Sequence, residues 1–154
     1  MPSVTDPTTQ QPVHIGHTIG MQIVERADGR SVLSWNAQPE YGFPTASGQV
    51  IHGGMVTTIL DSAMGGAAWS VLTDEEVFLT ADLRVEFYRA TRPGPLTAKG
   101  LVITRTKRLV FCSAELFDAD GQLLAGSRCT QTVLPARGGA GRPDPAKRGF
   151  DARG

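Results

Sequence analysis

Apolar and polar residues alternate through most of the C-terminal half of the chain, with the period of two that is typical of β-strands. In VFLTADLRVEFYRA, which begins at Val77, the apolar residues on one side of the predicted strand are Leu79, Ala81, Leu83, Val85 and Phe87. The alternation continues over residues 94–134 and is interrupted by turn-forming residues at 92–95 and 120–121. This half of the chain therefore predicts four strands joined mostly by tight turns.

Two more strand patterns precede this region. MQIVERADGRSVLSWNA, which begins at Met21, consists of two short apolar runs on either side of Asp28-Gly29, a pair that favours a tight hairpin turn. The segment PEYGFPTASGQ that follows is rich in Gly, Pro and small polar residues, so it is predicted as a loop.

Between these strand regions the apolar residues follow a helical period, which predicts one helix from about Gly53 to about Leu72. Its larger apolar face contains Val56, Ile59, Leu60, Ala63, Ala67 and Val71. A second face contains small residues and one carboxylate: Gly54, Thr57, Thr58, Asp61, Gly65 and Ala68. One helix combined with a run of antiparallel strands predicts an α+β fold, in which the helix covers a sheet of about six strands.

The start of this helix offers candidate chemistry. The first N–H groups of a helix have no intrahelical partner and carry partial positive charge, and Gly53 and Gly54 leave them sterically accessible. Such a site suits a carbonyl oxygen that becomes an oxyanion. Asp61 lies about two turns, or about 12 Å, further along the helix. The small-residue face therefore predicts close approach of a substrate or a second chain beside a carboxylate.

Composition narrows the function classes. The chain has 154 residues, which suits one domain, and its formal net charge is zero, so no overall charge attracts nucleic acid or an anionic membrane. It contains no apolar run near the ~20 residues of a membrane span, and its N-terminal sequence lacks a signal peptide pattern. Cys112 and Cys129 lie apart in strand-like runs without metal-ligand spacing, so we expect reduced core cysteines in a cytoplasmic protein and no metal site.

The predicted domain boundaries follow from the composition of the chain ends. Residues 1–12 are rich in Pro, Thr and Gln, and residues 135–154 contain five basic residues and two Asp among many Gly and Pro. Such segments bury too little apolar surface to offset the chain entropy lost on ordering. We therefore expect a flexible N-terminal segment, a domain over residues 13–134 and a disordered basic tail. Deletion of residues 138–154 should leave the fold and its melting temperature nearly unchanged.

The segment HGGMVTTILDSAMG closely resembles the HGG motif of hotdog-fold acyl-CoA thioesterases of the phenylacetate-pathway (PaaI-like) type. In that motif a histidine and two glycines precede, on the central helix, an acidic residue nine positions after the histidine, as Asp61 follows His52 here. The segment LTADLRVEFY resembles the next family strand, in which Thr80 occupies the position of a Ser or Thr. Residues 105–130 resemble the last two strands, so the resemblance covers roughly residues 15–134.

The resemblance implies a sheet wrapped around a long central helix, and a homodimer at least, with sites at the interface and two dimers forming a homotetramer. It implies hydrolysis of acyl-CoA thioesters, with coenzyme A as part of the substrate and no separate cofactor. Asp61 would be the general base or nucleophile, and the Gly53 N–H would polarise the thioester carbonyl. His52 would position the loop or contact the thioester, and Thr80 would reach the site from the other subunit.

Several further residues are candidate substrate contacts. The family usually has Asn six residues before the histidine, where this chain has Ala46. Either Ser47 or Gln49 supplies the missing donor, or the site lacks this contact. Gly54 is expected beside the thioester. The phosphates of coenzyme A require basic side chains, and the candidates at strand ends and turns are Arg105 and Arg108, together with Arg89, Arg92 and Lys107.

Two alternatives remain open. The first is an acyl-CoA-binding protein of the same fold without catalytic activity, because Ala46 removes one expected donor. The second is a hotdog hydratase or dehydratase, whose site uses a histidine as a proton shuttle with a different spacing. The identity of the acyl group, whether aryl, phenylacetyl or aliphatic, is not determined by the sequence.

Overall fold

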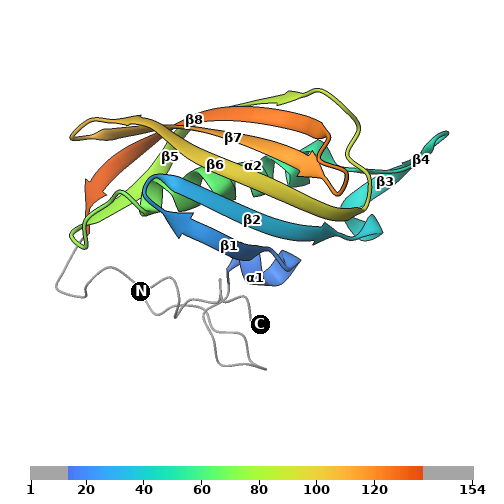
Figure 1. The fold of residues 1–154 in the computed structure, drawn as a ribbon, viewed down its shortest axis with the longest axis horizontal. Coiled ribbons are helices and arrows are strands. Elements are labelled where there is room, and N and C mark those ends of the chain that lie inside the picture. The colour runs from blue at the N-terminus through green and yellow to red at the C-terminus, as the bar shows by residue number, and fades with distance from the viewer. Residues whose placement is uncertain (1–13, 137–154) are drawn as a thin grey trace.

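The computed structural model describes residues 14–136. The predicted flexible N-terminal segment and almost all of the predicted tail lie outside these residues. The elements, in chain order, are α1 (Ile15–Ile19), β1 (Gln22–Ala27), β2 (Arg30–Ala37), η1 (Pro39–Tyr41), β3 (Gly42–Thr45), β4 (Gly48–Ile51), α2 (Gly53–Trp69), β5 (Glu76–Phe87), β6 (Gly94–Arg105), β7 (Leu109–Asp118) and β8 (Leu123–Pro135) (Figure 1).

Six strands form one antiparallel sheet in the order β1-β2-β6-β7-β8-β5. Hairpins join β1 to β2, β6 to β7 and β7 to β8, and the Asp28-Gly29 turn has the positive φ angles that a tight hairpin requires, 50° and 75°. β5 alone joins the sheet out of chain order, because it pairs with the last strand, β8. The predicted α+β architecture, with a sheet of about six strands, is confirmed.

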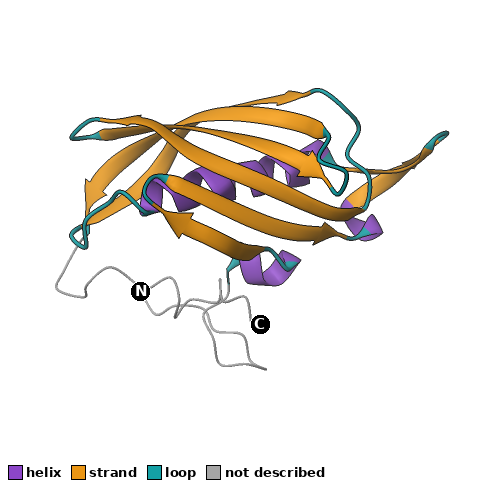
Figure 2. Cartoon of the chain, viewed as in Figure 1, coloured by secondary structure: helices purple, strands orange, loops and turns teal. Residues whose placement is uncertain are grey.

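The sheet curves around α2, which lies lengthwise against its inner face (Figure 2). The core forms between these two layers, and its largest fully buried apolar side chains are Trp35, Leu33, Ile59, Leu60, Met64, Leu116, Val56 and Val110. Four of these belong to the predicted apolar face of the helix or its immediate neighbours. The helical period of the sequence therefore identified most of the buried face. Ala68, assigned to the small-residue face, is also fully buried, and Val71 lies beyond the helix and is partly buried.

Small residues let α2 approach the sheet closely. A Cβ added to Gly100 of β6 would lie 2.2 Å from the Ala63 carbonyl oxygen, and the Ser31 hydroxyl of β2 donates a hydrogen bond to the same oxygen. A Cβ on Gly66 would meet the Ser31 side chain at 3.1 Å. The glycines of this helix and of β6 thus have a packing role as well as any role at the site.

Two local predictions are wrong. The segment expected as a loop forms η1 and the two-stranded hairpin β3–β4, which projects from one end of the molecule. Its turn is held by a hydrogen bond of 2.6 Å from Thr45 Oγ1 to the Gly48 carbonyl, and Gly48 has a φ of 107°. The helix ends at Trp69 rather than Leu72, because the Ser70 hydroxyl donates to Ala67 and accepts from the Gly29 N–H of the β1–β2 turn.

β5 also departs from simple alternation. Its pairing with β8 shifts register between Thr80 and Asp82, so Ala81 forms a bulge. Leu83 and Val85 pack against the core as predicted, whereas Leu79 is 64% exposed, and Thr80 faces α2 in its place. One extra residue exchanges the two faces of a strand, and this exchange directs Thr80 toward the helix.

Candidate active site

His52 caps the N-terminus of α2. Its Nδ1 accepts a hydrogen bond of 2.9 Å from the Gly54 N–H, and its carbonyl accepts from Met55 and Val56. With Nδ1 acting as an acceptor, the neutral imidazole carries its proton on Nε2, which is available as a donor. A Cβ on Gly54 would lie 2.9 Å from Nδ1, so the cap depends on glycine at this position.

The cap distinguishes the two glycines that were predicted together. The Gly54 N–H is occupied by His52, whereas the Gly53 N–H has no hydrogen-bond acceptor among residues 14–136. The ring of Phe87 lies close to Gly53, since a Cβ added to Gly53 would be 3.3 Å from it. Gly53 is therefore the glycine that can offer an N–H group to a ligand at this helix terminus.

Asp61 lies on α2 and contacts β5. Its Oδ1 lies 3.1 Å from Thr80 Oγ1, which donates to it. Burial raises the pKa of the Asp61 carboxyl above its usual range, and the hydrogen bond from Thr80 lowers it, with burial the larger effect. The resemblance implied that Thr80 acts from the other subunit, whereas the structure makes this contact within one chain.

Asp61 and Gly53 of one chain lie too far apart to act on the same carbonyl group. They are separated by about two helical turns, or about 12 Å along the axis. A reacting carbonyl must lie within about 3 Å of both the oxyanion donor and the attacking group. One chain therefore supplies two half-sites: the helix N-terminus, and the Asp61–Thr80 pair.

A cleft of about 340 Å³ opens beside the helix N-terminus. It is lined by Gly53 and Val56 of α2, by residues of the β3–β4 hairpin, and by the end of β5 and the segment after it: Phe43, Val50, Ile51, Phe87, Tyr88, Arg89, Ala90 and Thr91. Arg89 is exposed and is the basic residue of this lining. The cleft thus combines aromatic walls, a free N–H group and one positive charge.

Ser47 and Gln49 belong to the projecting hairpin rather than to either half-site. The Ser47 hydroxyl accepts from Arg92 Nη2 at 3.0 Å, and Gln49 Nε2 donates to the Pro39 carbonyl at 2.9 Å. Arg92 also donates to the Gln49 carbonyl. In this chain these residues stabilise the hairpin, and neither contacts Asp61 or Gly53.

Arg105 and Arg108 lie near the other end of α2. Arg105 donates to both carboxylate oxygens of Glu76, at 2.6 and 2.7 Å, and to the Val71 carbonyl just beyond the helix. Its charge is therefore already paired, and hydrogen bonding from Thr73 and Arg105 lowers the pKa of Glu76. Arg108 lies in the exposed β6–β7 turn. The structure does not bring either arginine to the cleft at the helix N-terminus.

Gln131 is a site residue that the sequence did not predict. This residue of β8 is fully buried, and its side-chain amide contacts both Thr80 Oγ1, at 2.9 Å, and Cys129 Sγ, at 3.2 Å. One signal in the sequence could have identified it: Gln131 is a polar residue two positions after Cys129, so both face the same side of β8, which is the buried side. Gln131 connects the Asp61–Thr80 pair to the core.

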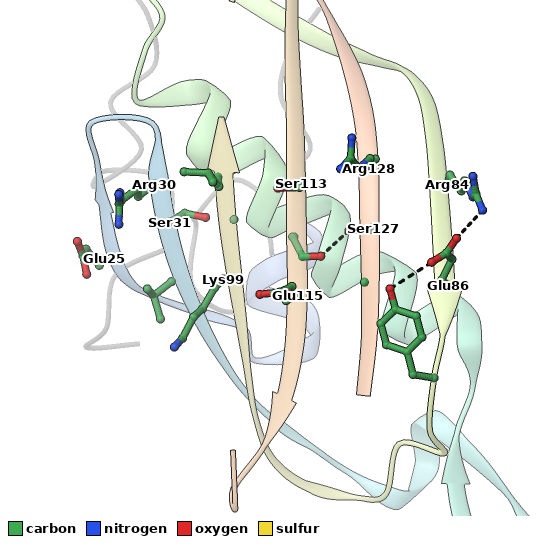
Figure 3. Close-up of a pocket in the computed structure, with 16 residues that line it drawn as sticks. Glu25, Arg30, Ser31, Arg84, Glu86, Lys99, Ser113, Glu115, Ser127 and Arg128 are labelled. Atoms are coloured by element: carbon green, nitrogen blue, oxygen red, sulfur yellow. Dashed lines mark hydrogen bonds and ion pairs between the residues drawn. The ribbon is translucent and has the colours of Figure 1, made fainter. Parts of the chain in front are cut away.

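A larger hollow of about 690 Å³ lies on the outer face of the sheet, away from α2 (Figure 3). Its charged side chains have mixed signs and come from all six strands of the sheet: Glu25, Arg30, Lys99, Glu115, Arg128, Arg84 and Glu86. Arg84 forms an ion pair with Glu86, which also accepts from Tyr88. Neither Asp61 nor Gly53 lines this hollow, so it contributes to neither half-site.

The described residues contain no group of three His, Cys, Asp or Glu side chains that could hold a metal ion. Within the same part of the chain, no helix has the length and apolar character needed to cross a membrane. Cys112 and Cys129 are both buried and free.

Comparison with known proteins shows the same fold and family. The sequence profile described as "Thioesterase superfamily" matches residues 48–125, which include His52, Asp61 and Thr80. A candidate esterase of Saccharolobus solfataricus, SSO1253, is 30% identical over 115 residues, covering 75% of this chain and 74% of that protein. The structure of a thioesterase family protein from Silicibacter pomeroyi has 26% identity and a TM-score of 0.71, covering 79% of this chain and 89% of that one.

The E. coli PaaI protein from the phenylacetic acid degradation operon is similar in fold, with a TM-score of 0.69 at 19% identity, covering 77% and 83% of the two chains. The family and these relatives support thioester hydrolysis as the general activity. The chain belongs to the thioesterase superfamily and has its hotdog fold.

Proposed function

We propose that the protein hydrolyses acyl-CoA thioesters, in the manner of the PaaI-like enzymes that its HGG segment resembles. The observation that carries this proposal is Asp61, a half-buried carboxylate on α2 held by Thr80. As a general base, Asp61 takes a proton from water while the water oxygen bonds to the thioester carbon. As a nucleophile, it bonds to that carbon itself, and water then hydrolyses the anhydride. In either case the carbon–sulfur bond breaks and the coenzyme A sulfur takes up a proton.

The separation of the half-sites supports a shared site. Because Gly53 and Asp61 of one chain are about 12 Å apart, we propose that Gly53 acts with Asp61 of the partner subunit. The Gly53 N–H would hold the carbonyl oxygen and stabilise its negative charge in the transition state. A homodimer is then the minimal active unit, and we propose a homotetramer of two dimers as the assembly.

The cleft beside the helix N-terminus suits the substrate. Phe43 and Phe87 offer aromatic surface for the acyl or pantetheine group, and Arg89 offers a charge for a phosphate. His52 Nε2 is available to donate to the thioester. No separate cofactor is required, because coenzyme A arrives with the substrate. The free buried cysteines agree with a cytoplasmic location, where thiols stay reduced.

The proposal is tested by measuring thiol release from a panel of aryl, phenylacetyl and aliphatic acyl-CoA substrates. We expect turnover of at least one of them. Asp61→Asn should lower kcat by about 10²–10⁴-fold, because it removes the base and keeps the side-chain volume. KM should change little, since the Gly53 N–H and the cleft are untouched.

Ser62→Ala is a matched control on the same helix, because within residues 14–136 the Ser62 hydroxyl donates to the Thr58 carbonyl of its own helix and not to Asp61. It should retain normal turnover. Acyl-CoA binding without thiol release would identify a binding protein instead. Addition or loss of water at the acyl chain, with the thioester intact, would identify a hydratase or dehydratase.

A further inference from the structure

Gln131 is a fully buried polar side chain, and within residues 14–136 its side-chain partners, Thr80 and Cys129, belong to one hydrogen-bond network. Its Oε1 lies 2.9 Å from Thr80 Oγ1, and its Nε2 lies 3.2 Å from Cys129 Sγ. Thr80 Oγ1 in turn lies 3.1 Å from Asp61 Oδ1. A buried amide is costly unless its groups are hydrogen-bonded, so these contacts fix where Gln131 can sit.

The number of available protons restricts the directions of the hydrogen bonds that connect Asp61, Thr80 and Gln131. The Thr80 hydroxyl has one proton, yet it faces two oxygens, one on Asp61 and one on Gln131. An ionised Asp61 can only accept, so the Thr80 proton must point toward it. Thr80 Oγ1 must then accept from Gln131, which requires an N–H group where the Gln131 oxygen lies.

Rotation of the amide resolves this conflict. A half-turn about the Gln131 Cγ–Cδ bond exchanges the oxygen and nitrogen without moving the rest of the side chain. Gln131 then donates to Thr80, Thr80 donates to Asp61, and the Cys129 thiol donates to Gln131 Oε1. If Asp61 is protonated, the directions reverse: Asp61 donates to Thr80, Thr80 to Gln131, and Gln131 to Cys129.

We propose that Gln131 is a positioning residue whose amide orientation follows the charge on Asp61 and fixes the direction in which the Thr80 hydroxyl donates. This gives the ionised carboxylate a donor that is itself polarised by a second donor behind it. Hydrogen bonds that point in one direction toward a charge strengthen one another. The catalytic consequence rests on the proposed function. The linkage between the charge on Asp61 and the orientation of the Gln131 amide is a property of the folded chain alone.

The titratable groups around this hydrogen-bond network are compatible with both directions of hydrogen bonding. Cys129 of β8 and Cys112 of β7 face the network from the sheet, and α2 contains no charged residue other than Asp61. The hydrogen bond with Cys112, burial and the Asp61 charge raise the pKa of Cys129, so its thiol stays protonated. To donate to Gln131 Oε1, the S–H bond of Cys129 must turn from the Cys112 sulfur toward Gln131. No charged group among the described residues contributes to the pKa shift of Asp61.

The linkage is measured by NMR on the full-length wild-type protein. The ¹³C carboxyl signal of Asp61 and the ¹⁵N and ¹H signals of the Gln131 side-chain amide are followed from acidic to neutral pH. We expect both residues to titrate with the same midpoint, and the Gln131 response to be lost in Thr80→Val. Gln131 amide signals that stay constant while Asp61 titrates would overturn the proposal, whether or not the protein is active.

Kinetics test the consequence for the reaction. In Gln131→Met the ionised carboxylate loses the polarised donor, so the acidic limb of the kcat/KM profile should move to higher pH. The expected shift is about half to one pH unit, the size of one neutral hydrogen bond. In Thr80→Val the same Gln131→Met change should cause no further shift, because Gln131 acts through Thr80.

Ser127→Ala is the matched control. Ser127 is also a buried polar residue of β8, and its hydroxyl contacts the Met64 sulfur and the Ala114 carbonyl rather than Thr80. It should leave the midpoint unchanged. Equal shifts in Ser127→Ala and Gln131→Met, or additive shifts with Thr80→Val, would show a general packing effect and overturn the positioning role. A wild-type protein that releases no thiol but shows the NMR linkage would refute the proposed function and leave the linkage standing.

Discussion

At the scale of single residues, the environment of Asp61 sets its chemistry. Burial destabilises its charged form, and one hydrogen bond from Thr80 partly offsets this effect. A base whose pKa lies closer to the working pH transfers protons more effectively than an ordinary surface aspartate. The cost of this arrangement is borne by the folded state, which holds a partly desolvated charge.

The first prediction concerns the pH dependence of activity. Because the ionised form of Asp61 is required, kcat/KM should fall as pH falls through the pKa of Asp61, above the ordinary value of 3.8. Thr80→Val removes the bond that lowers this pKa, so the acidic limb should move to higher pH. A profile without an acidic limb, or one unchanged in Thr80→Val, would place the chemistry on another group.

The second prediction concerns stability at the same residue. A carboxyl group whose pKa is raised in the folded state destabilises the fold once pH exceeds its ordinary pKa. Asp61→Asn should therefore raise Tm at pH 7, and the gain should disappear below the ordinary pKa of aspartate. Thermal denaturation at both pH values measures it. A loss of Tm at pH 7 would instead show that the carboxylate stabilises the fold.

The third prediction concerns His52. Removing its cap in His52→Ala should destabilise the protein by about 1 kcal/mol, as for other N-caps. His52→Asn keeps a side-chain acceptor for the Gly54 N–H and should retain most of that stability. Denaturant unfolding of the two variants separates capping from any role of the imidazole in turnover. Equal stability of both variants would rule out the cap.

At the scale of elements, the contact between α2 and β6 decides how closely the helix lies against the sheet. The Ala63 carbonyl occupies the space where a side chain at Gly100 would be. The backbones are rigid on both sides of this contact, so a methyl group cannot be accommodated by a side-chain rotation. The position of Asp61, two residues before Ala63, depends on this packing.

The fourth prediction follows from that contact. Gly100→Ala should destabilise the protein by roughly 3 kcal/mol or more, at the upper end for overpacked cores, or prevent folding. Leu101→Ala, at the exposed next position of β6, is the control and should cost much less. Denaturant midpoints compare them. A mild effect at Gly100 would mean that α2 can move away from β6.

At the scale of the whole molecule, a single chain exposes several large apolar side chains around the half-sites, more than a surface that only faces water requires. Large hydrophobic side chains exposed there are Leu79 and Phe87 of β5, with Phe43 and Tyr88 beside the cleft. Contiguous exposed apolar residues mark interaction surfaces. β5 is also an edge strand of the six-stranded sheet, with backbone groups available for pairing.

The fifth prediction concerns assembly. Light scattering should give a mass at least twice that of the 16.4 kDa chain. Leu79→Glu should shift the protein toward monomer and reduce thiol release, because Gly53 of one subunit would no longer lie beside Asp61 of the other. Val24→Glu, equally exposed on the opposite edge strand β1, should leave the mass unchanged. A stable and fully active monomer would eliminate the shared site.

The sequence by itself determined the order and type of the main elements, because burial on one face leaves a local period of two in strands and about 3.6 in helices. It also singled out His52, Gly53 and Asp61, which lie within ten residues on one helix and its cap, so that spacing along the chain fixes their relation in space. Thr80 was recovered through its resemblance to a family strand, although its contact within the same chain was not.

Only the tertiary structure decided the contacts between distant segments. Thr80 and Gln131 are 51 residues apart and meet because β5 pairs with β8 in a register shifted by the Ala81 bulge. The pairing of Arg105 with Glu76 and the close approach of Gly100 to Ala63 depend equally on how strands and helix pack. Local periodicity records which residues are buried, but strand register and packing determine which buried residues meet, and these depend on the whole chain at once.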